Sequence, residues 1–384
     1  MSRPVAYILD RSLLLVAGTA AALIWANTGP LSYGHVAHAL HFAVNDIGMV
    51  FFFGLATKEI VESTLPGGSL ASPKAAAVPL LAAAAGMIAP AALYWGGAVA
   101  SGHPELGRGW AIPCATDIAF SYLVARLIFP ARHPAIPFLL LLAVADDALG
   151  LLVLAVFYPA GPVSPSLCAL FMVPALAIAW ILRRRRVRGF WPYVLLAGSC
   201  SWLGLYLGGL HPALALVPIV PFMRHEAAYH DLFDEATLHA ADTLNRFAAW
   251  WRVPVQAILL LFGLANAGVP LSGVGPATWL VAAALIVGKP LGVVLMTAAA
   301  ARAGLARPAG VSYGDVLVIG LTAGIGFTVA LFFATAAFPS GPALDAAKMG
   351  ALLSFLAAPL AIGLGRTVSS AASTMRRGRS RSQA

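Results

Sequence analysis

Long apolar segments alternate with short polar ones along almost the whole chain of 384 residues. About 12 of these segments reach roughly 20 residues, the length that a helix needs to cross the hydrocarbon core of a bilayer. They begin near Arg11, Asp46, Lys74, Gly109, Pro134, Ser164, Gly189, Gly209, Arg252, Thr278, Val311 and Asp345. The pattern predicts an all-α polytopic membrane protein with about 12 transmembrane helices.

The composition supports a membrane protein and argues against other classes. Hydrophobic residues make up 60% of the chain and charged residues 10%, whereas soluble domains carry roughly 25% charged residues. The three cysteines form no Cys-x-x-Cys pair, so neither a zinc site nor a disulfide framework is predicted. The net charge of +9 fits basic cytoplasmic loops better than nucleic-acid binding. We expect no cofactor, no nucleic-acid partner and no enzymatic activity.

The basic residues predict the orientation of the helices. If loops are numbered alternately with the N-terminus inside, 21 of the 24 Lys and Arg residues fall on the inside, which places both ends in the cytoplasm. Arg3 and Arg11 precede an apolar run without a clear cleavage site, so we interpret that run as an uncleaved first helix. Residues 1–368 are predicted to form a single transmembrane domain. The Ser- and Arg-rich residues 369–384 are predicted to form a disordered cytoplasmic tail.

Two adjacent aspartates, Asp146 and Asp147, interrupt the apolar segment from Phe138 to Phe157. A carboxylate at that depth is costly unless it faces water, an ion or a partner. Neighbouring residues on a helix diverge by about 100°, so both side chains can line one polar cavity. Two ionised carboxylates held close together repel each other, and binding a proton or a small cation relieves that repulsion. The pair therefore indicates a site that exchanges protons for a cation.

A further acidic group lies beside a predicted helix break. Pro113 removes one helix hydrogen bond, and Thr116 and Asp117 follow it closely and can cap a new helix start. This pattern is typical of an interrupted transmembrane helix. Lys289, which precedes a proline in another apolar segment, needs a counter-charge if it is buried. Its candidate partners are Asp117, Asp146 and Asp147.

Residues 320–328 are rich in glycine within an apolar segment. The pattern fits a second interrupted helix and a close helix–helix contact through small residues equally well. The two interruptions fall in corresponding places of two blocks, about 74–158 and 277–366. Broken helices at matching positions of inverted repeats indicate an ion site at the membrane midplane. With crossed breaks, Asp117 would offset the positive helix ends and Lys289 the negative ends.

Four motifs in order resemble the NhaA-type sodium/proton antiporters, a family that is itself an example of transporters built from inverted repeats. They read Gly109-Trp-Ala-Ile-Pro-Cys-Ala-Thr-Asp117-Ile-Ala-Phe120, Asp146-Asp147, Gly288-Lys-Pro-Leu-Gly292 and Gly324-Ile-Gly-Phe-Thr328. The resemblance runs from about Leu13 to Gly365. It implies two broken, crossing helices within inverted repeats, and a multi-pass protein of the bacterial inner membrane.

The resemblance also implies roles for individual residues. Asp146 and Asp147 would bind Na⁺ and protons, together with Thr116. Asp117 and Thr116 would lie at the break in the fourth span, and Lys289 would pair with an aspartate, above all Asp146. The implied activity is electrogenic export of cytoplasmic Na⁺ or Li⁺ in exchange for external protons, which serves pH homeostasis. The implied partners are Na⁺, Li⁺, H⁺ and membrane lipid.

The sequence departs from the family pattern at the cytoplasmic end of the second span. Family members often read Gly-Leu-Glu-Val-Lys-Arg-Glu there, whereas this chain has Ala56 and Ile60 at two of the acidic positions. In the family this cluster is linked to activation by pH. Lys58, Glu59 and Glu62 remain as candidates for a pH response.

Two further candidates lie at the ends of predicted spans. His211 matches a histidine associated with pH response in the family, but a histidine at the end of a span is more often a hydrogen-bonded anchor. Asp46 is predicted to cap the start of the second span, with a role in an outer ion funnel as the alternative. The outer segment from Gly29 to Asn45 is shorter than the hairpin that some members use in dimer contacts. Any homodimer would therefore lack that hairpin.

Other transporter classes fit the sequence less well. An organic-anion/sodium symporter on a related fold is the main alternative, but two carboxylates at the site would repel an anion. A cation channel usually has a symmetric ring of acids or carbonyls in its filter, which one asymmetric chain does not supply. The sequence contains no P-loop, which argues against an ATP-driven pump.

Overall fold

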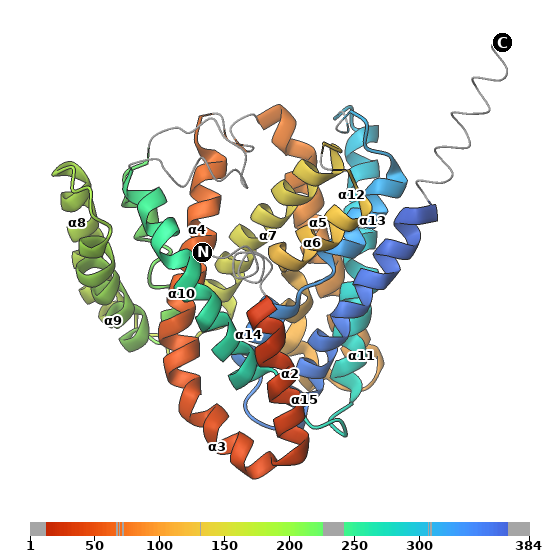
Figure 1. Ribbon diagram of the computed structural model, residues 1–384, viewed down its shortest axis with the longest axis horizontal. Helices are drawn as coiled ribbons and strands as arrows, with labels where there is room; N and C mark the ends of the chain where they lie inside the picture. The colour runs from red at the N-terminus through yellow and green to blue at the C-terminus, as the bar shows by residue number, and fades with distance from the viewer. Residues whose placement is uncertain are drawn as a thin grey trace, which may run out of the picture. The chain divides into compact units, whose positions relative to one another are not determined.

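The computed structural model describes residues 13–66, 68, 70, 73–130, 132–225, 242–305, 307 and 309–367. Every regular element within these ranges is a helix, and no strand occurs there (Figure 1). This agrees with the predicted all-α class, because a helix satisfies its own backbone hydrogen bonds in lipid. Arg3, Arg11 and the predicted tail, residues 369–384, lie outside the described residues.

The chain divides into two compact units, each built from discontinuous segments. Unit 1 comprises Met1–Ser72, Asp147–Gly273 and Thr335–Pro339. Unit 2 comprises Pro73–Asp146, Val274–Ala334 and Ser340–Ala384. Unit 2 therefore contains most of both predicted repeat blocks.

Unit 1 contains helices of very different lengths. Its longer helices are α2 (Leu13–Thr28), α3 (Pro30–His41), α4 (Met49–Thr64), α8 (Pro165–Arg184) and α10 (Thr243–Asn266). Its shorter elements are the π-helices η1 (Phe42–Gly48) and η3 (Tyr193–Gly198), helix α9 (Ser199–Leu207), and the 3₁₀ turns η4 (Pro212–Leu214) and η5 (Val220–Phe222). Helix α10 packs against α2 and α4, and α8 packs against α9.

Unit 2 contains both bent helix pairs and the first half of the helix that carries the two aspartates. Its elements are α5 (Pro73–Ala100), η2 (Pro104–Cys114), α6 (Ile118–Ile128), the start of α7 (Ala135–Phe157), α11 (Pro276–Ala283), η7 (Ala284–Gly288), α12 (Lys289–Arg302), α13 (Tyr313–Ala323), most of α14 (Phe327–Ala337), α15 (Pro342–Leu353) and η8 (Ser354–Leu356). Helix α12 packs against both α5 and α13 (Figure 1). Helix α11 packs against α15.

Seven helices in the described part of the chain are long and apolar enough to cross a membrane, and the two bent pairs raise that number to nine. Leu13–Thr28 and Tyr193–Leu207 are shorter apolar helices. The span predicted from Gly209 does not form a continuous helix, because only the short turns η4 and η5 occur there. Three prolines lie in this segment, and each lacks the N–H group that a regular helix needs.

The predicted helix start at Asp46 is wrong. The segment from Gly29 to Asn45 was expected to join two spans, but it contains α3, and η1 and α4 continue the helix without a break to Thr64. Pro30 at the first position of α3 favours a helix start there. Asp46 consequently lies inside the π-helix η1 and does not cap a helix start.

Helix α7 begins with a side-chain cap from a histidine. The backbone N–H of Ala135 donates to Nδ1 of His133 at 3.2 Å. The backbone N–H of Ile136 donates to the His133 carbonyl at 3.0 Å, and the His133 ring stacks on Phe129 with its centroid 4.9 Å away. These bonds satisfy the first N–H groups of α7, which have no partner within the helix.

Candidate functional site

The two bent helix pairs of unit 2 form the centre of the candidate site. The axes of η2 and α6 are bent by 58° relative to each other, and those of α13 and α14 by 50°. The first interruption follows Pro113, as the sequence predicts. The sequence left the glycine-rich segment open between an interruption and a close packing contact, and the structure shows both.

Two glycines at the second break allow backbones to approach closely. A Cβ atom at Gly324 would lie 2.5 Å from the carbonyl oxygen of Leu285, and one at Gly326 would lie 2.6 Å from that of Ala115. Small residues at such contacts permit tight packing inside a membrane. The glycines therefore bring the second break against the first, because Ala115 belongs to the first break.

Hydrogen bonds join the two breaks directly. The backbone N–H of Asp117 donates to the carbonyl of Ile325 at 2.8 Å. The Thr116 hydroxyl donates to the carbonyl of Ala323 at 3.0 Å. The Ser121 hydroxyl donates to the carbonyl of Thr322 at 2.7 Å. The last carbonyls of a helix have no partner within that helix. The two hydroxyl groups therefore satisfy the C-terminal end of α13, and the N–H of Asp117 binds the chain just after it.

Asp117 lies at the N-terminal ends of two helices. It is the N-cap of α6 and accepts from the backbone N–H of Phe120 at 3.4 Å. Its other carboxylate oxygen accepts from the backbone N–H of Thr328 at 3.4 Å and from the Thr328 hydroxyl. Thr328 is in the first turn of α14. One carboxylate thus faces the partial positive charges of α6 and α14, where the sequence placed it.

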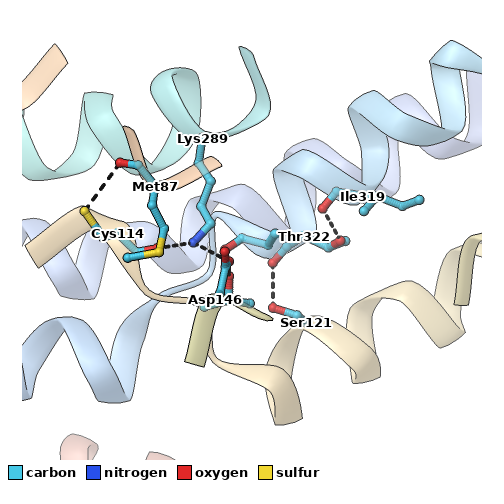
Figure 2. Close-up of polar contacts among 9 residues, drawn as sticks. Met87, Cys114, Ser121, Asp146, Lys289, Ile319 and Thr322 are labelled. Carbon is cyan, nitrogen blue, oxygen red and sulfur yellow. Dashed lines mark hydrogen bonds and ion pairs between the residues drawn. The ribbon is translucent and has the colours of Figure 1, made fainter. Parts of the chain in front are cut away.

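Lys289 and Asp146 form an ion pair with both side chains fully buried. Lys289 Nζ lies 2.9 Å from Asp146 Oδ2, and it donates to the carbonyl of Cys114 at 2.5 Å (Figure 2). Cys114 is the last residue of η2, so the ammonium group faces the partial negative end of that helix. Lys289 begins α12 directly after the π-helix η7. Pro290 has no N–H group for the regular helix pattern, and the π-helix just before it departs from that pattern.

Thr116 joins the Lys289–Asp146 pair through Oδ2 of Asp146, and the other carboxylate oxygen remains without a hydrogen bond among the described residues. The Thr116 hydroxyl lies 2.7 Å from Asp146 Oδ2 and donates to it. Asp146 Oδ1 is buried and has no hydrogen-bond partner among the described residues. Carboxylate, hydroxyl and carbonyl oxygens are the ligands that hard cations prefer. A small cation at Oδ1 would satisfy this oxygen.

Asp147 differs from its neighbour in exposure. It is partly exposed, whereas Asp146 is fully buried. The boundary between the two units falls between these residues, so Asp146 is assigned to unit 2 and Asp147 to unit 1. Both belong to the single helix α7. Shared binding of one ion by the two aspartates remains a prediction.

The candidate pH-response residues of α4 form a small ion-pair group in unit 1. Lys58 Nζ lies 2.6 Å from Glu62 Oε2 and 3.1 Å from Glu59 Oε1. Lys58 is buried, and the two glutamates are partly exposed. The positive charge of Lys58 is thus shared between two acids.

His211 and Asp46 also lie in unit 1. His211 directly precedes the turn η4 and is partly exposed. The indole N–H of Trp202 donates to the backbone carbonyl of Asp46 at 2.7 Å, which ties η1 to α9. A pH response at His211 and an ion funnel at Asp46 remain predictions.

Three groups at the site were not identified from the sequence. They are the Ser121 hydroxyl, the Thr328 hydroxyl and the carbonyl of Cys114. Thr328 lies within a motif that was recognised, but nothing in the motif assigned it a role. Serine in an apolar helix has no distinctive spacing, and a backbone carbonyl carries no sequence signal at all.

The described residues contain no group of three or more His, Cys, Asp or Glu side chains that could hold a metal ion.

The sequence model of the Na⁺/H⁺ antiporter 1 family matches residues 9–364. A protein from Geobacter metallireducens named Na(+)/H(+) antiporter NhaA is 48% identical over 380 residues, which cover 95% of this chain and 98% of that protein. A protein of the same name from Desulfitobacterium hafniense is 46% identical over 371 residues, covering 94% of this chain and 95% of that protein.

The fold is similar to that of a solved structure, the sodium proton antiporter MjNhaP1 from Methanocaldococcus jannaschii at pH 8. The TM-score is 0.54, over 93% of this chain and 90% of that chain. The two sequences are 14% identical, so this likeness concerns the fold alone. The family match and the relatives each span nearly the full chain, and the protein therefore belongs to the Na⁺/H⁺ antiporter 1 family.

Proposed function

We propose that the protein exports cytoplasmic Na⁺ or Li⁺ in exchange for external protons, with Asp146 and Asp147 as the shared ion and proton site. The observation that carries this proposal is the buried Asp146–Lys289 pair, in which one carboxylate oxygen has no hydrogen-bond partner among the described residues. The relatives named Na(+)/H(+) antiporter support the same activity.

Competition at Asp146 explains how such a site would couple the two ions. A proton and a cation each neutralise the carboxylate, so only one of them is bound at a time. When Asp146 is neutralised, Lys289 loses its counter-charge but keeps the Cys114 carbonyl as a hydrogen-bond acceptor. The ammonium group therefore stays beside the partial negative end of η2.

The charge balance favours electrogenic exchange. Asp146 and Asp147 provide two titrating groups on one helix, while Na⁺ and Li⁺ each carry one positive charge. If both carboxylates take up protons when the ion leaves, more positive charge returns than departs. The membrane potential then drives export.

The membrane arrangement is part of the same proposal. We place the protein in the bacterial inner membrane with about 12 spans and both ends in the cytoplasm, as a single transporter domain of residues 1–368 followed by a basic tail. Inverted repeats at about 74–158 and 277–366 are supported by one bent helix pair in each block. A homodimer, if it forms, would do so without an outer hairpin.

The alternative of an organic-anion/sodium symporter finds no support at this site. Asp146 is fully buried with one oxygen lacking a hydrogen-bond donor. An organic anion needs donors and positive charge, but the ammonium group of Lys289 is already shared between Asp146 and a carbonyl.

Flux in everted membrane vesicles tests the proposed function. Adding Na⁺ or Li⁺ to vesicles that hold an acidic interior should release protons, and adding K⁺ should serve as the comparison cation. Between pH 6 and 9, the apparent Na⁺ affinity should weaken as pH falls, by up to about tenfold per pH unit for each competing proton. Vesicles from cells without the protein provide the background. The proposal fails if neither Na⁺ nor Li⁺ releases protons at any pH in this range.

The sparse acidic cluster on α4 predicts a shallow pH response. Steepness grows with the number of coupled titrating groups, and Ala56 and Ile60 occupy two positions that are acidic in many family members. The double variant Ala56→Glu/Ile60→Glu should therefore steepen the activation curve measured in the same vesicles. Ala56→Gln/Ile60→Gln is the matched control, because it adds similar volume without charge. A steep wild-type curve that neither double variant changes would place the pH gate elsewhere, for example at His211.

A further inference from the structure

Ser121 lies in the first turn of α6 with its side chain fully buried. Its hydroxyl donates to the carbonyl of Thr322 at 2.7 Å, and Thr322 is in the last turn of α13 (Figure 2). The contact therefore ties the second half of the first bent pair to the first half of the second pair. Sodium binding, as proposed above, does not itself require this residue, because Ser121 does not contact Asp146.

The residue after Thr322 connects this contact to the ion site. The carbonyl of Ala323 accepts from the Thr116 hydroxyl at 3.0 Å, and the same hydroxyl donates to Asp146 Oδ2 at 2.7 Å. A hydroxyl has one proton and two lone pairs. Thr116 can therefore give a full hydrogen bond to only one of these acceptors at a time.

The two positions of that proton have different consequences for a cation. When the proton points to Asp146, it competes with a cation for the carboxylate. When it points to the Ala323 carbonyl, the lone pairs of Thr116 face the carboxylate side, and the hydroxyl can act as a ligand. Cation binding thus depends on how well the Ala323 carbonyl is placed to accept the proton.

We propose that Ser121 is a positioning residue that sets the cation affinity of Asp146 by fixing the Ala323 carbonyl opposite Thr116. The inference rests on the proposed function, because it assumes that Asp146 binds the transported cation. Ser121 acts through the end of α13 and not by touching the ion.

The hydrogen bonds around Thr322 indicate that loss of the Ser121 hydroxyl would change the position of the α13 end without unfolding it. The carbonyl of Thr322 also accepts from the backbone N–H of Ile325 at 3.1 Å. Removing the Ser121 hydroxyl therefore does not leave a buried carbonyl without any partner, which is the costly case. The α13 turn is expected to remain folded but to be held less firmly.

The variant Ser121→Ala tests the proposal in everted vesicles at alkaline pH, where protons compete least. The apparent Na⁺ affinity should weaken about fivefold, the size expected for one net hydrogen bond. The maximal rate at saturating Na⁺ should stay within about twofold of wild type, since no ion ligand is removed. Ser121→Thr keeps a hydroxyl and should restore the wild-type affinity.

Ser201→Ala is the matched control. Ser201 is also fully buried, and its hydroxyl donates to the carbonyl of Ala215 at 2.7 Å. It lies on α9 in unit 1 and belongs to no part of the ion site. Its loss should lower the thermal unfolding temperature at least as much as Ser121→Ala does, but should leave the apparent Na⁺ affinity unchanged.

The outcomes distinguish the inference from the function on which it rests. Wild-type vesicles without cation-dependent proton flux would reject the proposed function. Normal wild-type flux with an unchanged Na⁺ affinity in Ser121→Ala would overturn only the role of Ser121, as would an equal loss of affinity in Ser201→Ala.

If Ser121→Ala does not reach the membrane, Ser121→Cys replaces it. A thiol is a weaker donor than a hydroxyl. The apparent Na⁺ affinity of Ser121→Cys should therefore be lower than that of wild type, but by less than fivefold. An affinity equal to that of wild type would again overturn the role.

Discussion

Asp146→Asn and Asp147→Asn should each abolish Na⁺-dependent proton flux in everted vesicles while leaving the protein in the membrane. An amide cannot take up and release a proton in the physiological range, and it offers a cation a neutral oxygen in place of a charged one. Because Asp146 is fully buried beside Lys289, its replacement removes both the cation ligand and the group that titrates. The expected loss is at least about 100-fold, which corresponds to roughly 3 kcal/mol.

A third aspartate in unit 2 provides the matched control for this prediction. Asp315 is buried and accepts from the backbone N–H of Ser312 at 2.7 Å in the capping box of α13. Asparagine can also accept at a helix start, so Asp315→Asn should retain most of the flux. Membrane content should be measured for all three variants. Normal flux in both Asp146→Asn and Asp147→Asn would reject the aspartate pair as the exchange site.

Lys289→Ala should lower the stability of the detergent-solubilised protein, and adding Asp146→Asn should recover part of the loss. Removing one partner of a buried ion pair leaves the other charge uncompensated, which costs roughly 3–5 kcal/mol in a dry site and less in a wet one. In Lys289→Ala, the Thr116 hydroxyl is the one donor to Asp146 that remains among the described residues. The measurement is the thermal unfolding temperature of the two single variants and the double variant.

Lys348 provides a control for this double-mutant comparison, because it lies outside the Lys289–Asp146 pair. It is also buried in unit 2, on α15. Side chains that do not interact give additive effects, so Lys348→Ala and Asp146→Asn should add. If Lys289→Ala and Asp146→Asn proved additive as well, the pair would not stabilise the protein in solution.

The first break was predictable because its residues act locally. Pro113 removes a helix hydrogen bond wherever it stands in a helix, and Asp117 accepts from the backbone N–H of Phe120, only three residues away. The second break was not decided by sequence, because glycine marks both interruption and close packing. Gly324 and Gly326 serve both purposes, and only the position of Leu285 and Ala115 in space reveals the second one.

The predictions that failed used hydropathy to place helices, although backbone hydrogen bonding determines where a helix starts and ends. The segment from Gly209 is apolar, but its prolines divide it into short turns. Asp46 is the first charged residue of an apolar run, yet the helix around it begins sixteen residues earlier, at Pro30. Ser121 was missed for a different reason. Its importance comes from a carbonyl two hundred residues away along the chain, and no local pattern records such a contact.

The histidine cap of α7 ties the start of this helix to the end of α6. Nδ1 of His133 accepts a hydrogen bond from the backbone N–H of Ala135, and the same ring stacks on Phe129, the residue that caps the end of α6. One side chain therefore links the helix that Asp117 caps to the helix that carries Asp146. A displacement of either helix at this end must carry the other helix with it or break the stacked contact.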